Sequence, residues 1–334
     1  MFGTRSFSYY GSKSRWLWLY FNMIPKKQYK VFLDACMGSG GIIATAQMLD
    51  VEKRIANEKD FNLYRLHKVL QNNYSGFVRE LLKLEYNEKL FEEMKIRAET
   101  FYEGFSEEKA AAVEYCQIQF SFNNNRKNMR KKSEPFIERS QRNAICGLED
   151  FSLALQGVEI RNRDCLEEIP KFIHERDAFI FQDSPYRPQL RKSPHAYTVD
   201  TDEAWHKKFL ELLVQEHNHG GICSDMMICC YVDFEEETED IGNDMEHIKR
   251  FCESMKNDAY CKALMPLGFS LLRIKRTVKP TVNKAKSEND DSENQSKKSP
   301  ATECIFFNFE LPDEAYDFVT RDDILAYNDV FECN

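Results

Sequence analysis

Residues 31–70 read VFLDACMGSGGIIATAQMLDVEKRIANEKDFNLYRLHKVL, and this stretch decides the fold class. Its apolar runs are separated by a glycine turn and by helix-period sequence. The expected elements are, in order, a strand over Val31–Asp34, the glycine turn GSGG at 38–41, a helix over Ile42–Leu49, a strand over Arg54–Asn57 and a helix over Leu63–Leu70. Strand, glycine turn, helix and strand in this order predict a parallel, doubly wound, Rossmann-like α/β sheet.

The sequence between residues 75 and 150 has a different pattern, charged and with helix period but without strand signals. We therefore expect a mainly helical insertion at 75–150, which divides the sheet domain into residues 1–74 and 151–334. Strand patterns then resume over Val158–Arg161, Ala178–Phe181 and Gly221–Tyr231, and end in a hairpin of residues 269–278 and 303–311. Residues 284–302, inside this hairpin, are polar and of low complexity, so we expect them to be disordered.

Composition limits the class of protein without deciding it. The 334 residues suit one domain with a sizeable insertion, or two domains. The net charge of -9 argues against a uniformly basic nucleic-acid coat, but it leaves room for a local basic patch. Such a patch lies between Asn123 and Asn143, where seven Lys or Arg residues accompany two Glu residues.

The basic patch has two interpretations, a solvated helix face or a contact with DNA. Three consecutive Asn residues and flanking Phe residues add side chains that can contact bases, which makes DNA contact as strong an interpretation as a solvated helix face. The candidate DNA-binding residues of the patch are Asn123, Arg126, Lys127, Arg130 and Lys131. Arg187 and Arg191, further along the chain, are candidate phosphate contacts.

Cysteine and histidine patterns predict neither disulfides nor a metal site. None of the 11 Cys residues forms a Cys-x-x-Cys pair, and several lie inside apolar runs, as reduced intracellular thiols do. The seven His residues show no metal spacing, and we assign them no catalytic role. No apolar run approaches the ~20 residues of a membrane span, and the N-terminus lacks the apolar core of a signal peptide. We therefore expect a soluble, cytoplasmic protein without a metal.

The strongest short signal is the tetrapeptide Asp183-Ser184-Pro185-Tyr186, directly after the apolar run DAFIF. A carboxylate at the carboxyl end of a buried strand lies where open α/β sheets bind ligands. The Asp carboxylate and a backbone carbonyl can accept the two hydrogens of an exocyclic amine, while the Tyr ring stacks on the base. Taken alone, the tetrapeptide is more often a strand end that is followed by a turn; its neighbours in the sequence reverse this preference.

Two further signals favour an adenosyl-binding site. The glycines at 38–41 follow Asp34 and its strand, and such glycines let the backbone approach a ligand at the start of a helix. Many plain α/β turns share this pattern, and the third glycine of a dinucleotide site is absent. Glu58 follows the second strand, where an acid can bind the ribose hydroxyls; a helix-start acid is the alternative.

Together these residues resemble the Dam-type family of adenine-N6 DNA methyltransferases, in the arrangement whose target-recognition insertion precedes the catalytic motif. Successive family elements are matched by Tyr9-Tyr10-Gly11-Ser12-Lys13, Asp34–Gly41, Asn57–Leu63, Asn162–Cys165 and Asp183–Tyr186, followed by Tyr197, residues 205–210 and residues 303–309. The resemblance covers nearly the whole chain, and the ordered set is far more specific than any one of its members.

The resemblance implies that the methyl group of S-adenosylmethionine is transferred to the amine of a flipped-out adenine in double-stranded DNA. Asp183 and the carbonyl of Ser184 would accept the amine hydrogens, and Tyr186 would stack on the base. The implied cofactor-binding residues are Tyr9, Tyr10, Lys13, Asp34, Gly38, Ser39, Gly40, Glu58, Asp164, Cys165 and Asp183. We expect a monomer; a partner restriction endonuclease is left open.

Departures from the family pattern keep two alternatives open. Ser184 replaces a proline in the catalytic motif, Ala35-Cys36 replaces Pro-Phe, and Ser12 replaces a glycine. Ser184 favours a catalytically weak DNA- or cofactor-binding relative. A methyltransferase that acts on RNA or on a protein amide is the other alternative, but such enzymes usually begin the tetrapeptide with Asn and lack the N-terminal element and the basic insertion.

Overall fold

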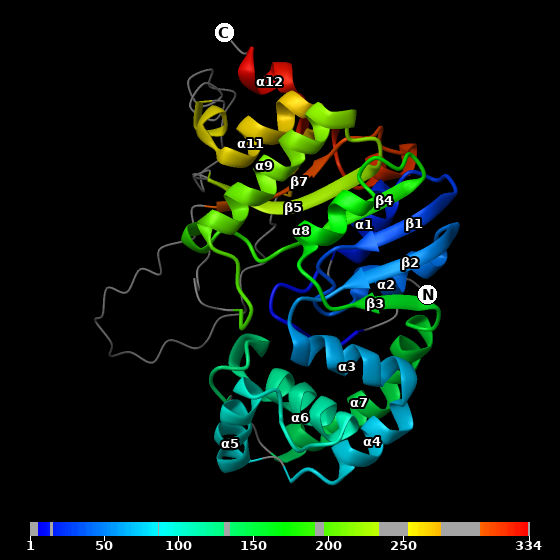
Figure 1. Ribbon diagram of the computed structural model, residues 1–334, viewed down its shortest axis with the longest axis vertical. Coiled ribbons are helices and arrows are strands. Elements are labelled where there is room, and N and C mark those ends of the chain that lie inside the picture. Colours follow the sequence, from blue (N-terminus) through cyan, green and yellow to red (C-terminus); the bar gives the residue numbers. More distant parts are fainter. Residues whose placement is uncertain are drawn as a thin grey trace, which may run out of the picture.

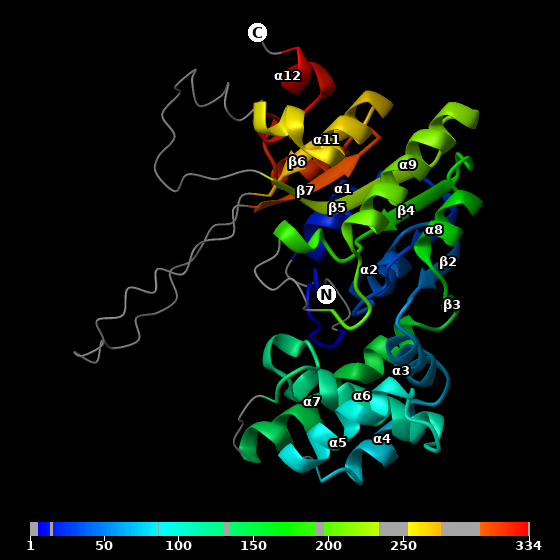
Figure 2. The same cartoon turned by 60° about the vertical axis from the view of Figure 1, so that its left-hand side comes forward.

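The computed structural model describes residues 6–13, 16–85, 87–129, 134–190, 197–233, 253–274 and 301–332. An eight-stranded sheet with helices on both faces forms one part of the molecule, and a group of helices below it forms the other (Figures 1 and 2). The strands are β1 Tyr29–Asp34, β2 Val51–Asn57, β3 Val158–Arg161, β4 Ala178–Gln182, β5 Asp225–Asp233, β6 Ser270–Arg273, β7 Ala301–Phe307 and β8 Ile324–Leu325.

The strand order is β3-β2-β1-β4-β5-β7-β6-β8, and β1 to β5 run parallel. From β1 the chain winds outward to β2 and β3, and then returns to the other side of β1 to form β4 and β5. The order therefore reverses between β1 and β4, which is where doubly wound sheets bind ligands. β7 is antiparallel to both β5 and β6, so the predicted hairpin is present. The predicted doubly wound α/β fold is confirmed.

Helices cover both faces of the sheet. One face carries α1 Leu17–Met23, α2 Gly41–Thr45, α3 Phe61–Asn72 and part of α7; the other carries α8 Cys165–Glu168, α9 Glu203–Gly220, α11 Ala259–Leu264 and α12 Tyr327–Phe331. Because successive side chains of a strand point to opposite faces, Phe32 packs in the first layer while Val31 and Leu33 pack in the second. Strands covered on both faces are mainly apolar, as β1 and β4 are between their polar end residues.

The helical part consists of α4 Tyr74–Leu82, α5 Glu88–Glu99, α6 Glu107–Phe120 and α7 Glu134–Ala154, and it lies below α3 in Figure 1. Helix α6 is its centre, buried along most of its length by α3, α4 and α5. Three consecutive alanines, Ala110 to Ala112, let these helices approach closely. No helix in the described part of the chain is both long and apolar enough to cross a membrane.

The element bounds differ from the sequence predictions in small ways. The helix expected over Ile42–Leu49 is instead α2 followed by a 3-10 turn, Ala46–Met48. The strand expected over Gly221–Tyr231 begins only at Asp225. Residues 284–300 of the predicted disordered segment lie outside the described residues, while Ala301 and Thr302 belong to β7.

Candidate active site

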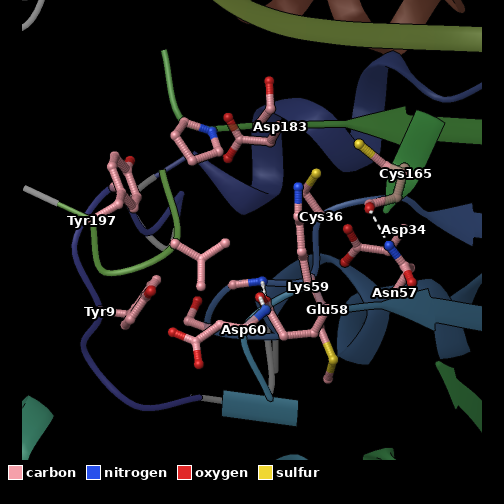
Figure 3. A pocket seen from close by; sticks show the side chains of 18 of the residues that line it. Tyr9, Asp34, Cys36, Asn57, Glu58, Lys59, Asp60, Cys165, Asp183 and Tyr197 are labelled. Atoms are coloured by element: carbon pink, nitrogen blue, oxygen red, sulfur yellow. Dashed lines mark hydrogen bonds between the residues drawn. The ribbon is translucent and has the colours of Figure 1, made fainter. Parts of the chain in front are cut away.

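A pocket of about 930 Å³, including its open mouth, lies at the carboxyl ends of β1, β2 and β4 (Figure 3). Ten of the predicted cofactor residues line it: Tyr9, Tyr10, Lys13, Asp34, Gly38, Ser39, Glu58, Asp164, Cys165 and Asp183. Ser184 and Pro185 of the tetrapeptide also line it, whereas Gly40 and Tyr186 do not.

The glycine turn after β1 is shaped by local geometry that only glycine permits. Gly40 has φ 77°, and a Cβ atom there would lie 2.7 Å from the ring of Phe151. The turn is also fixed from outside, because the His67 Nε2 and the Gly38 carbonyl oxygen are 2.8 Å apart. Burial lowers the pKa of His67 to about 4, so the ring is neutral and Nε2–H donates to the carbonyl. Gly40 therefore does not line the pocket itself but sets the conformation of the turn that does.

Glu58 fixes the other side of the glycine turn. Its Oε2 accepts a hydrogen bond from the Gly38 N–H at 3.0 Å, and its Oε1 accepts one from the Asp60 N–H at 2.9 Å. Burial, helped by the charge of Asp60, raises the pKa of Glu58 to about 8, although these N–H groups oppose the shift. Glu58 thus offers the pocket a buried carboxyl whose two oxygens keep further acceptor capacity.

Asp34, at the end of β1, is the least satisfied polar group of the pocket. Neither carboxyl oxygen has a well-aligned hydrogen bond to a described residue. Burial and the nearby Asp183 carboxylate raise the pKa of Asp34 to about 8, against the pull of backbone N–H groups at Cys36 and Ile43. A buried carboxyl without a well-aligned hydrogen bond, facing a pocket, is a candidate for binding a ligand with donors or positive charge.

Asp164 lies at the far end of the pocket, where it caps α8. It accepts from the Leu166 N–H at 3.0 Å and pairs with Lys59 at 2.6 Å. Burial opposes ionisation, but Lys59, the Leu166 N–H and Trp205 together outweigh it and lower the pKa of Asp164. Asn57 joins this region to β1, because its amide donates to the carbonyls of Ala35 and Arg163 at 3.1 and 3.0 Å.

The tetrapeptide after β4 is held by the N-terminal segment. Lys13 Nζ lies 2.8 Å from both carboxylate oxygens of Asp183, and 4.8 Å from the centroid of the Tyr186 ring. Tyr186 is 7% exposed and packs edge-on against Tyr231, with centroids 4.3 Å apart. Asp183 and Tyr186 therefore surround one ammonium group, Asp183 in the pocket wall and Tyr186 beside it.

The N-terminal segment reaches this position through a close glycine contact. Gly11 has φ 77°, and a Cβ atom there would lie 2.3 Å from the Tyr197 hydroxyl. Tyr10 packs edge-on against Tyr197, with centroids 5.0 Å apart. Figure 3 shows Tyr9 and Tyr197 on one side of the pocket, and Asp34 and Cys165 on the other.

The model of the D12 class N6 adenine-specific DNA methyltransferase family matches residues 9–227. The chain belongs to this family. The match begins at Tyr9 and ends within β5, so it includes every strand that lines the pocket. A comparison with curated proteins gives no match.

Membership of the D12 class confirms the resemblance to Dam-type enzymes. The protein is an enzyme that methylates adenine N6 in DNA, and the family implies S-adenosylmethionine as the methyl donor. The family favours this activity over an RNA or protein amide methyltransferase.

The structure of this D12-class methyltransferase corrects the expectation for Arg126. Its guanidinium is not a surface cation; it pairs with Asp60 at 2.6 Å and with Glu114, and it donates to the Tyr9 hydroxyl at 3.2 Å. The side chain is 9% exposed. With two carboxylates already bound, Arg126 joins the insertion to the pocket wall, and its contact with DNA stays a prediction.

Arg187 requires the same correction. It forms a buried ion pair with Asp258, the N-cap of α11, and its side chain is 8% exposed. Burial opposes its charge, but Asp258 outweighs burial and raises the pKa of Arg187. The residue therefore anchors the chain after the tetrapeptide, and its contact with a phosphate stays a prediction.

The other candidate DNA-binding residues divide into two groups. Lys127 is partly exposed and lies beside the 3-10 turn Phe122–Asn124, which contains Asn123. Arg130, Lys131 and Arg191 lie outside the described residues. The sequence did not indicate the network behind the tetrapeptide, which contains Thr201, His206 and Tyr260.

Proposed function

We propose that this methyltransferase binds S-adenosylmethionine at the carboxyl ends of β1 and β2, and places the target adenine against the tetrapeptide after β4. The single observation that carries the proposal is that Asp34, Glu58 and Asp183 line the same pocket. A cofactor held near Asp34 and Glu58 is therefore within one pocket of the carboxylate that would bind the amine.

The pocket suits the chemistry of this cofactor. Glu58 retains acceptor capacity for ribose hydroxyls, and Asp164, beyond β3, is placed for the adenine ring. Asp34, which has no well-aligned partner, suits the positively charged end of the molecule. When bound, S-adenosylmethionine supplies the electrophilic methyl group of its sulfonium.

The tetrapeptide residues have distinct roles in this proposal. The Asp183 carboxylate accepts one amine hydrogen and the Ser184 carbonyl accepts the other, which directs the nitrogen lone pair away from the ring. The Lys13 ammonium pairs with the negative charge of the Asp183 carboxylate. Lys13 also lies 4.8 Å from the centroid of the Tyr186 ring, on which the base is proposed to stack. Positioning and electrostatics then provide most of the acceleration.

The helical insertion is proposed to recognise double-stranded DNA. Lys127 and Asn123 lie in the segment after α6, on the part of the chain with the basic sequence. Extruding the adenine from the duplex costs a few kcal/mol, which phosphate and base contacts of the insertion would offset. We propose that the enzyme acts as a cytoplasmic monomer; no residue assigns a partner endonuclease.

Incubation with methyl-labelled S-adenosylmethionine and separate pools of mixed-sequence DNA, RNA and protein tests this function. We expect label only in DNA, and only as N6-methyladenine after digestion to nucleosides. Label in RNA or protein would assign a different substrate. Label in no pool would identify a relative that binds DNA without transfer, the outcome that Ser184 would favour.

A further inference from the structure

A chain of hydrogen bonds lies behind the tetrapeptide, on the α9 and α11 side. The Thr201 Oγ1 is 2.7 Å from the Pro185 carbonyl oxygen, and the His206 Nε2 is 3.1 Å from Thr201 Oγ1. The His206 Nδ1 is 2.6 Å from the Tyr260 hydroxyl. Thr201, His206 and Tyr260 are 8%, 3% and 1% exposed, so water does not compete for these bonds.

The direction of every bond in this chain follows from the carbonyl at its end. A carbonyl oxygen cannot donate, so the Thr201 hydroxyl donates its one hydrogen to Pro185. Thr201 Oγ1 must then accept from His206 Nε2–H. When the imidazole is neutral, its other nitrogen accepts, and the Tyr260 hydroxyl then donates to His206 Nδ1. Burial raises the pKa of Tyr260 well above its usual range, which keeps this donor protonated.

The same two helices hold the chain on both sides of Tyr186. Thr201 precedes α9, His206 is in its first turn, and Tyr260 is in the first turn of α11. Asp258, the N-cap of α11, forms the buried ion pair with Arg187. Pro185 and Arg187 are thus both fixed to this layer, and the backbone between them presents Tyr186 towards Lys13.

We propose that Thr201, His206 and Tyr260 are positioning residues that set the Pro185–Tyr186 peptide, and through it the Ser184 carbonyl and the Tyr186 ring. The inference rests on the proposed role of the tetrapeptide. Ser184 lacks the ring that restricts φ in a proline, so its backbone is held less by its own chemistry. The hydrogen-bond chain Tyr260–His206–Thr201–Pro185, here called the relay, instead restrains the adjoining Pro185–Tyr186 peptide from outside. A 1 Å misplacement of reacting groups costs about 100-fold in rate, so the fixation affects turnover more than binding.

The decisive comparison is between Thr201→Val and Thr201→Ser. Valine keeps the shape but removes the hydroxyl, whereas serine keeps the hydroxyl. With DNA and saturating S-adenosylmethionine, we expect Thr201→Val to lower kcat by about 10- to 100-fold. The Kd for S-adenosylmethionine should change by less than about twofold, and Thr201→Ser should recover most of kcat. Wild-type kcat in Thr201→Val, or an equal loss in the serine variant, would overturn the proposal.

Two further variants separate positioning from folding. Ser152→Ala removes another buried hydroxyl that donates to a backbone carbonyl, that of Leu70 at 2.6 Å, remote from the tetrapeptide. Its kcat should equal that of the wild type at a temperature where both are folded. If Thr201→Val does not fold, Tyr260→Phe removes only the last hydroxyl of the relay. We then expect a several-fold lower kcat with unchanged cofactor Kd, and an unchanged kcat would overturn the proposal.

Asp183→Asn in the same assay distinguishes failure of the relay from failure of the proposed function. If Asp183→Asn is inactive while Thr201→Val has wild-type kcat, the tetrapeptide is catalytic and only the relay is wrong. If Asp183→Asn retains activity, the tetrapeptide is not the catalytic motif, and the relay has nothing to position.

Discussion

Buried ionisable side chains are paired differently in two regions, the pocket edge of the sheet and its junction with the helical insertion. At the sheet edge, Asp34 and Glu58 are buried acids without an ion-pair partner among the described residues, and their pKa values are both raised to about 8. At the junction, Arg126 is matched by Asp60 and Glu114. A buried charge that is balanced holds structure together, whereas an unbalanced acid is available to a ligand. Partners therefore separate a binding residue from a structural one where residue type does not.

Removing the cation from the Arg126–Asp60–Glu114 cluster should have the largest effect on stability. Arg126→Met leaves Asp60 and Glu114 buried without their cation, and we expect the free energy of unfolding to fall by about 3–5 kcal/mol. Urea denaturation measures the loss. Lys95→Met removes an exposed pair with Glu92 and should cost less than about 1 kcal/mol. A loss at Arg126 as small as that at Lys95 would show that the junction does not depend on its ion pairs.

Asp34 and Glu58, the buried acids without an ion-pair partner among the described residues, should make the free energy of unfolding depend on pH. A carboxyl whose pKa rises on folding holds its proton more tightly in the folded protein, so the contribution of these two carboxyls to stability without ligand is greatest at acid pH. It falls as pH rises from about 4 towards the folded value of about 8. Each of Asp34 and Glu58 contributes a slope of about 1.4 kcal/mol per pH unit inside that window.

Amide variants test this slope. Asp34→Asn and Glu58→Gln should each remove about one such contribution, and the double variant should remove both, as measured by urea denaturation at pH 5, 6 and 7. The amides cannot ionise, so the stability of each variant relative to the wild type should be greater at pH 7 than at pH 5. Unchanged slopes would contradict the claim that these two carboxyls are buried without compensating partners.

Steric crowding between Gly40 and Phe151 should have a smaller effect on the free energy of unfolding. Gly40→Ala places a Cβ atom 2.7 Å from Phe151 at φ 77°, so we expect a loss of about 2–4 kcal/mol from strain and overpacking together. Gly104 has φ 83° and open space around it, so Gly104→Ala should cost only about 1–2 kcal/mol. Equal losses in thermal unfolding would show that Phe151 does not shape the turn.

Exposed charge on the insertion should have the smallest effect, and it should appear only with DNA. If Lys127 contacts a phosphate, Lys127→Ala should reduce the slope of log K against log salt by about 1, with similar weakening for all DNA sequences. Lys95→Ala, on the same part of the molecule, should leave the slope unchanged. Matching slopes for the two variants would remove Lys127 from the DNA-binding surface.

Local sequence patterns predicted what is local in the structure. The strand Val158–Arg161 has the bounds expected of it, and Asp183 follows β4 as predicted, because an apolar run followed by a polar residue marks a strand end directly. Ten predicted cofactor residues share one pocket because the carboxyl ends of parallel strands meet at one edge.

Long-range pairing could not be predicted in this way. Arg126 looked like a surface cation within a basic run, but its partner Asp60 lies 66 residues earlier in the chain. The relay from Tyr260 to Pro185 joins residues from two helices and a turn, none with a distinctive spacing. His67 has no metal spacing, and its contact with Gly38 follows only from the packing of α3 beneath the glycine turn.

The most direct test of the central claim is the amount of N6-methyladenine that Asp183→Asn forms in DNA, with S-adenosylmethionine affinity measured on the same preparation by calorimetry. Asparagine keeps the shape of the side chain but loses the negative charge and one acceptor. The account predicts at least a ~1,000-fold loss of transfer, since positioned acceptors and electrostatics account for about 10²–10³ each, while the cofactor still binds. Transfer within tenfold of the wild-type rate would contradict it.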